Sequence, residues 1–93
     1  MSVTASHTRD VTLRYFAWVR EKVGHESEEL AIPEEVATVN ALIHWLAKRS
    51  PGHAEAFGDP TKLRCALDQT MVTGNAPLAK ATEIAFFPPV TGG

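Results

Sequence analysis

Hydrophobic and polar residues alternate along several short stretches of the chain. Val11, Leu13 and Tyr15 alternate with more polar neighbours near the start, and residues 63–67 and 83–87 repeat the pattern later. Successive side chains of a strand point to opposite faces, so a period of two residues indicates a strand with one buried face. We therefore predict strands over residues 11–17, 63–67 and 83–87.

Two more short strands are predicted, over residues 27–32, which Pro33 ends, and at residues 71–72. Between the first two strands, residues 18–23 predict a short helical turn that Gly24 closes, since glycine accepts the left-handed conformation that often ends a helix. Because only this short connection separates the two strands, we expect them to pair antiparallel.

One longer helix is predicted over residues 39–49. Thr38 precedes it and is expected to cap it, because its hydroxyl can accept a hydrogen bond from a first-turn amide. Residues 50–52 (Ser-Pro-Gly) are expected to end this helix, and residues 53–57 to add one further turn. Apolar residues recur at i, i+3, i+4 and i+7 and form one stripe for packing on a sheet: Val39, Leu42, Ile43 and Leu46.

This order of elements predicts an α+β fold, with a mixed sheet and one main helix packed on one of its faces. It matches the β-grasp, or ubiquitin-like, roll. We divide the chain into a flexible N-terminal arm or added extension (residues 1–10), a β-grasp domain (residues 11–87) and an extended C-terminal tail (residues 88–93). A chain of 93 residues is long enough for one core and too short for two.

Composition excludes several classes of function. The formal net charge is -2 and the sequence pI about 6.0, so the chain lacks the excess of Lys and Arg that nucleic-acid binders carry. No apolar run approaches the roughly 20 residues that cross a bilayer, and the polar N-terminus does not resemble a secretory signal. A single cysteine, Cys65, leaves no internal disulfide and is expected to be a small core residue. We expect a cytoplasmic protein in which Trp18 and Trp45 are packing residues.

The most informative feature is the C-terminus, where two glycines follow an aromatic–proline run, residues 86–91 (Phe-Phe-Pro-Pro-Val-Thr). Gly92 and Gly93 have no Cβ, so they form a thin tail that can enter a narrow pocket. Pro88 and Pro89 fix φ and favour an extended, stiff exit from the domain. The reactive group at the tip is the α-carboxylate of Gly93. A frayed terminus without function is the alternative.

These segments resemble the small subunit of molybdopterin synthase, the MoaD family. The resemblance lies in residues 13–17 (Leu-Arg-Tyr-Phe-Ala) with Arg20-Glu21 and Gly24, in residues 37–39, and above all in residues 83–93. An aromatic-Pro-Pro-Val-Thr-Gly-Gly ending is highly specific to these sulfur carriers. The resemblance covers about residues 11–93, although the loop before the last strand lacks the glycine that is usual in the family.

The resemblance implies a sulfur carrier that is not an enzyme on its own. In the family, an adenylating enzyme (MoeB-like) uses ATP to convert the terminal carboxylate into an acyl-adenylate, and sulfur then replaces the adenylate. Here the resulting thiocarboxylate would be on Gly93, with Gly92 as its slim neighbour. The loaded tail enters the large subunit (MoaE-like), which holds the catalytic pocket. Two transfers to cyclic pyranopterin monophosphate form the dithiolene of molybdopterin, and the family assembly is a heterotetramer.

The chain itself is expected to bind no cofactor and no metal. Its four histidines lack the spacing of a zinc site: His7, His25, His44 and His53.

A docking patch for the partners is predicted beside the tail. The alternation places Phe16 and Phe87 on the face away from the helix, and Met71 is expected to join them. Family interfaces use hydrophobic residues at the aligned positions. If the alternation slips at a bulge, Phe16 or Phe87 would instead be core. The tail residues before the diglycine are also expected to bind partners: Pro88, Pro89, Val90 and Thr91.

Three other functions remain open at this point. One is a thiocarboxylate carrier for thiamine or cysteine synthesis, although thiamine carriers generally lack the diproline run. Another is a ubiquitin-like modifier attached to lysines through Gly93. The last is an interaction module with an inert tail, for which deletion of the tail would leave partner binding unchanged.

Overall fold

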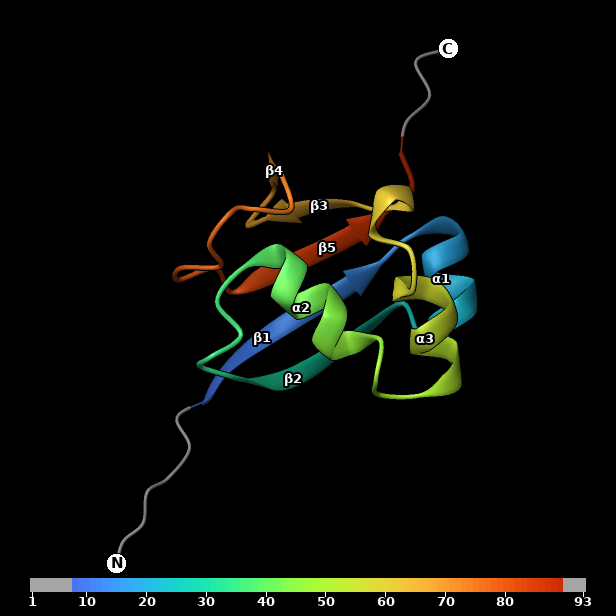
Figure 1. Cartoon of the computed structure of the whole chain (residues 1–93), viewed down its shortest axis with the longest axis horizontal. Helices are drawn as coiled ribbons and strands as arrows, with labels where there is room; N and C mark the ends of the chain where they lie inside the picture. Colours follow the sequence, from blue (N-terminus) through green and yellow to red (C-terminus); the bar gives the residue numbers. More distant parts are fainter. Residues whose placement is uncertain (1–7, 90–93) are drawn as a thin grey trace, which may run out of the picture.

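The computed structural model describes residues 8–89 of the 93-residue chain. Strands and helices follow the order expected of an α+β fold (Figure 1). The elements are β1 Thr8–Tyr15, α1 Ala17–Val23, β2 Ser27–Pro33, α2 Val39–Leu46, α3 Pro51–Phe57, the 3-10 turn η1 Pro60–Lys62, β3 Arg64–Leu67, β4 Thr70–Val72 and β5 Glu83–Phe87.

The five strands form one mixed sheet in the order β2-β1-β5-β3-β4. The central strands β1 and β5 are parallel, and the pairs β1–β2, β3–β5 and β3–β4 are antiparallel. In Figure 1, α2 crosses one face of this sheet, while α1 and α3 lie at the end where β1 and β5 finish. The predicted β-grasp architecture is confirmed.

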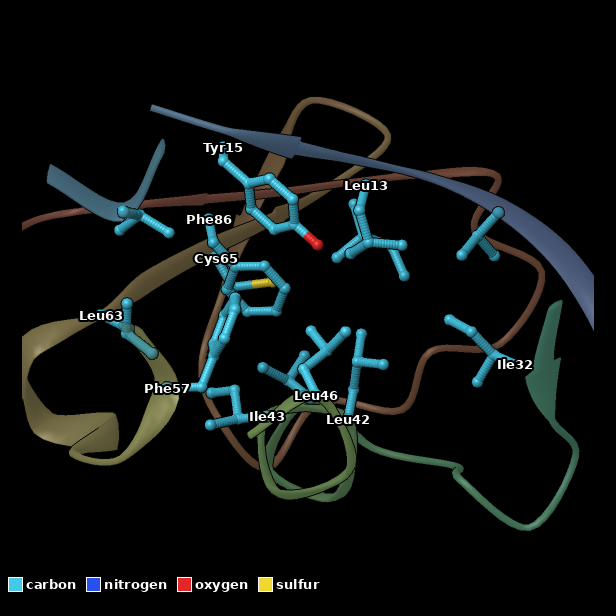
Figure 2. Close-up of a cluster of buried hydrophobic side chains, with 14 of the residues drawn as sticks. Leu13, Tyr15, Ile32, Leu42, Ile43, Leu46, Phe57, Leu63, Cys65 and Phe86 are labelled. Carbon is cyan, nitrogen blue, oxygen red and sulfur yellow. The ribbon is translucent and has the colours of Figure 1, made fainter. Parts of the chain in front are cut away.

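The core lies between the sheet and α2 (Figure 2). Leu13, Ile84 and Phe86 of the two central strands are fully buried, and the four stripe residues of α2 are 0–4% exposed. Each leucine-sized side chain buried in this way contributes roughly 1.5–3 kcal/mol. The predicted apolar stripe therefore forms the contact between helix and sheet.

The predicted cap at Thr38 and the predicted helix end at Gly24 are also confirmed, and a tight turn joins β3 to β4. Thr38 Oγ1 accepts a hydrogen bond from the Ala41 amide at 3.1 Å, as expected of an N-cap. Gly24 ends α1 with φ 93°. Asp68 and Gln69 connect β3 to β4 with φ 48° and 73°, the geometry of a tight hairpin turn.

The prediction for the end of the main helix was wrong. α2 ends at Leu46 rather than Arg49, and the Ser50-Pro51 pair begins a new helix instead of only ending the old one. The Ser50 hydroxyl accepts from the His53 amide at 3.1 Å, and Pro51 occupies the first helical turn, where its missing N–H has no partner to lose. The predicted single turn is thus a helix of seven residues, α3.

The bounds of β1 differ at both ends from those that the alternation predicted. The strand begins at Thr8, which pairs with Pro33, so pairing with β2 starts before the Val11 boundary of the predicted domain. It ends at Tyr15, and Ala17 is the first residue of α1 with φ 55°. The chain therefore leaves the sheet at Phe16.

Candidate functional site

The candidate site lies at the end of the sheet where both central strands finish. Tyr15 of β1 pairs with Phe86 of β5 in parallel, and the Phe16 amide donates to the Phe86 carbonyl at 3.1 Å. Because parallel strands end at the same edge, Phe16 is held next to the residues that lead into the tail. Long-range strand pairing thus brings together two positions that are far apart in the sequence.

Three hydrophobic side chains form a patch on the face of the sheet opposite α2. Phe16 is 44% exposed, Met71 is 61% exposed and Phe87 is half-buried. Between them lie Ala66 and Ala85, which are paired in register. We call these five residues the sheet-face patch. The predicted outward orientation is confirmed, and the alternative of a bulge that buries Phe16 is wrong.

The surface of the patch is shallow and carries one ion pair. A hollow of about 280 Å³ is lined by residues that include Arg14, Phe16 and Glu83. The Arg14 guanidinium lies 5.9 Å from the centre of the Phe16 ring and donates to the Glu83 carboxylate at 3.2 Å. Since Arg14 is half exposed, the pair contributes at most about 1 kcal/mol to stability. The patch is therefore apolar with a charged border.

Only part of the predicted tail is described. Pro88 and Pro89 follow β5 outside any strand, and both are half-buried. Val90, Thr91, Gly92 and Gly93 lie outside the described residues. Their roles stay predictions.

A buried polar network, which the sequence did not suggest, lies beneath this end of the sheet. His53 of α3 is 6% exposed, and its side chain contacts Glu28 of β2. Its Nε2 is 2.7 Å from Glu28 Oε2, and its Nδ1 is 2.7 Å from Ser50 Oγ. The Tyr15 hydroxyl donates to the same Glu28 oxygen, also at 2.7 Å. The network joins β1, β2 and α3.

Electrostatics in this network follow from burial and hydrogen bonding. Burial opposes ionisation of Glu28, but the hydrogen bonds from His53 and Tyr15 outweigh it and hold the pKa of this carboxyl below its usual value. Burial, together with the bond to Glu28, raises the pKa of Tyr15. The Tyr15 hydroxyl is therefore a permanent donor at neutral pH, and the network has a structural role.

One signal in the sequence could have identified half of this network. Ser50 and His53 have the spacing of an N-cap and the third helical residue, which places their backbone and side chains in contact. Nothing local connects Glu28 with His53, because only the packing of α3 against β2 brings them together.

Cys65 is buried in the core beside the aromatic side chains, as predicted (Figure 2). Burial raises the pKa of its thiol to about 12, so the thiolate that sulfur chemistry requires is scarce at neutral pH. The thiol therefore serves packing.

Two kinds of feature are absent from residues 8–89. Within this range, no group of three or more His, Cys, Asp and Glu side chains is placed to hold a metal ion. No helix in the same range is long and apolar enough to cross a membrane.

Comparison with known proteins decides the family. The ThiS family matches residues 13–93, which include the end of β1, all of β5 and the diglycine. This chain belongs to the ThiS family. The resemblance to the small subunits of molybdopterin synthase is also confirmed by individual relatives.

Two relatives are similar over almost their whole length. The molybdopterin synthase sulfur carrier subunit of Escherichia coli (strain K12) is 43% identical over 83 residues, which are 89% of this chain and 99% of that protein. The subunit of the same name from Haemophilus influenzae is 37% identical over 79 residues, 85% of this chain and 94% of that protein.

A solved structure supports the fold. A Pyrococcus furiosus protein, provisionally assigned as molybdopterin converting factor subunit 1, superposes with a TM-score of 0.68 at 29% identity. The superposition covers 87% of this ThiS-family chain and 98% of the other.

Proposed function

We propose that this chain is the sulfur carrier subunit of a molybdopterin synthase, with sulfur carried on Gly93. The observation that supports this most is the 43% identity to the Escherichia coli sulfur carrier subunit over 99% of its length. The family match extends through residue 93 and so includes the predicted tail.

The proposed chemistry follows from the nature of a terminal carboxylate. With an ordinary pKa of about 3.5, the Gly93 carboxyl is ionised at neutral pH and is a poor electrophile. An adenylating enzyme (MoeB-like) activates it: the carboxylate attacks the α-phosphate of ATP, and pyrophosphate leaves. Hydrosulfide then attacks the carbonyl carbon, the bond to AMP breaks, and loss of a proton leaves a thiocarboxylate, whose sulfur is a better nucleophile than the original oxygen. Splitting the exchange into two steps lowers the barrier of each.

The described residues support a defined route for this tail. Central strand β5 leads directly into Pro88 and Pro89, whose fixed φ favours an extended exit. The sheet-face patch lies beside this exit, and aromatic and methionine side chains are enriched at protein interfaces. We infer that the patch docks on the large subunit (MoaE-like) while the tail enters the catalytic pocket there, in a heterotetramer. Because the reactions use ATP and reduced sulfur, we place the protein in the cytoplasm.

Intact-protein mass spectrometry tests the carrier chemistry. The full chain is incubated with a molybdopterin-pathway adenylating enzyme, ATP and a sulfur donor. We expect a mass change equal to replacement of one oxygen by one sulfur, localised to Gly93. The chain without Gly93 is the matched control and should stay unchanged.

Other outcomes would reject the proposal. No mass change with an active loading enzyme would favour a carrier for thiamine or cysteine synthesis, or an inert tail. A ladder of isopeptide-linked adducts on a denaturing gel would favour a protein modifier.

A further inference from the structure

A second hollow lies beside the base of the tail, on the helical side of β5. Its volume is about 480 Å³, and four separate parts of the chain line it: Trp18 of α1, Ala56 of α3, Lys62 of η1 and Pro89. Figure 1 shows why these parts meet, since α1, α3 and η1 gather at the end of the sheet where β5 finishes. We call this hollow the tail-base groove.

The floor of the tail-base groove is apolar. Ala56 is 1% exposed, and Trp18 is partly buried against the core. Pro89, which is half-buried, forms the wall nearest to the tail. Trp18 and Pro89 leave part of their apolar surface accessible in the groove, and such a surface can become the centre of a protein interface.

The rim of the groove carries charges of both signs, from Lys22, Lys62, Glu55 and Asp59. Lys22 pairs with Glu55 at 3.4 Å, with both side chains at least half exposed. The Asp59 carboxylate accepts from the Thr61 amide and hydroxyl at 3.1 and 2.6 Å. Within the described range, Lys62 makes no ion pair closer than 4.0 Å. A partner can therefore complement the rim with an acidic group.

The length of the tail limits where its receptor can be. Gly93 is four residues beyond Pro89, and four extended residues span at most roughly 14 Å. A protein that encloses Gly93 must therefore approach Pro89 closely. The surfaces that flank Pro88 and Pro89 are the sheet-face patch on one side and the tail-base groove on the other.

We propose that the tail-base groove is a second docking surface for the large subunit, which inserts an apolar side chain against Trp18 and places a carboxylate near Lys62. This inference rests on the proposed function. The partner then contacts both the sheet-face patch and the tail-base groove. Together these two contacts set the direction in which the tail enters the catalytic pocket.

Binding of full-length variants to the cognate large subunit tests the groove. Trp18→Ala removes one wall and should weaken binding at least about tenfold, the effect of losing a central interface aromatic. Lys62→Glu changes an exposed side chain that the core does not need, and it should weaken binding more at low than at high salt. Thermal unfolding is measured in parallel for each variant.

Matched controls distinguish the loss of a contact in the groove from the general effect of a Trp→Ala or Lys→Glu substitution on the protein. Trp45→Ala removes a partly buried tryptophan of α2 that does not line the groove, and Lys48→Glu reverses an exposed lysine after the same helix. Neither should change the affinity more than about twofold, since neither residue lines the groove or belongs to the sheet-face patch.

Each outcome decides the inference. If Phe16→Asp weakens binding while Trp18→Ala and Lys62→Glu bind like the wild type, the groove is not a docking surface and the proposed function stands. If the groove variants lose affinity only for the adenylating enzyme, the large subunit is the wrong occupant. If the wild-type chain does not bind the large subunit at all, the proposed function fails and this inference fails with it.

Discussion

At the scale of single residues, Glu28 shows how a carboxylate can remain ionised in a largely buried site. One of its oxygens is 2.7 Å from both the Tyr15 hydroxyl and His53 Nε2. Burial would favour the neutral acid, yet two hydrogen bonds to the ionised form reverse this preference. The network therefore stabilises the fold only while Glu28 is charged.

This predicts a specific loss of stability in acid. The pKa of Glu28 is lower in the folded than in the unfolded chain. The contribution of the charged Glu28 to the free energy of unfolding is therefore complete at pH values above the unfolded-state pKa of about 4.3. It is lost as the pH falls through the folded-state value. Glu28→Gln should reduce the free energy of unfolding at pH 7, and the difference from the wild type should shrink below about pH 4.

Urea unfolding at a series of pH values measures this difference. Glu29→Gln changes the exposed neighbouring residue and is the control. A constant difference between Glu28→Gln and the wild type across the acidic range would show that ionisation of Glu28 does not contribute.

At the scale of elements, the contact between α1 and α3 depends on a glycine. A Cβ at position 52 would meet the backbone carbonyl of Lys22, near the end of α1. That carbonyl is main chain and cannot move aside as a flexible side chain could. The two helices that form the walls of the tail-base groove are therefore held close by the absence of a side chain.

The direction in which one substitution changes the free energy of unfolding tests this contact. Gly52→Ala lies in a helix, where propensity alone would stabilise the protein by up to about 1 kcal/mol. We expect instead a destabilisation of about 1–3 kcal/mol, because the added methyl forces α1 and α3 apart. Thermal or urea unfolding measures it, and Ala54→Gly on the exposed side of α3 reports the size of the propensity effect. A more stable Gly52→Ala protein would contradict the close approach.

At the scale of the whole molecule, the core and the sheet-face patch lie on opposite faces of one sheet. Leu13, Ile84 and Phe86 are buried against α2, while Phe16 and Met71 stay exposed on the other face. Substitutions on the outer face can therefore alter binding without altering the core.

Phe16→Asp should separate the two properties. We expect the free energy of unfolding to change by less than about 0.5 kcal/mol, because the ring is 44% exposed. Affinity for the large subunit should fall at least about tenfold, since a charge would be buried at the contact. Equal affinity of the variant and the wild type would remove the sheet-face patch from the proposed interface.

The tail should be separable from the fold in the same way. Deletion of Gly93 should abolish sulfur transfer, and Gly93→Ala should impair loading or transfer, because a Cβ must then fit both partners' pockets. Both variants should unfold like the wild type. Molybdopterin synthesis in a reconstituted assay is the measurement, and undiminished product from the truncated chain would contradict the assignment.

Much of the architecture could be predicted because its signals are local. The alternation of Leu13 and Tyr15, the stripe on α2 and the cap at Thr38 each depend on residues within one or two turns. The end of α2 was missed because Ser50-Pro51 is both a stop for one helix and a start for the next. Local sequence does not say which of these two signals dominates.

The sequence by itself determined the period of each element, the caps, the outward position of Phe16 and Phe87, and the family resemblance at the tail. Only the tertiary structure decided which distant side chains meet. Glu28 and His53, and likewise Trp18, Lys62 and Pro89, come together through packing between elements, which no local periodicity records. Secondary structure follows from near neighbours along the chain, whereas buried networks and grooves follow from the way the completed elements fill space.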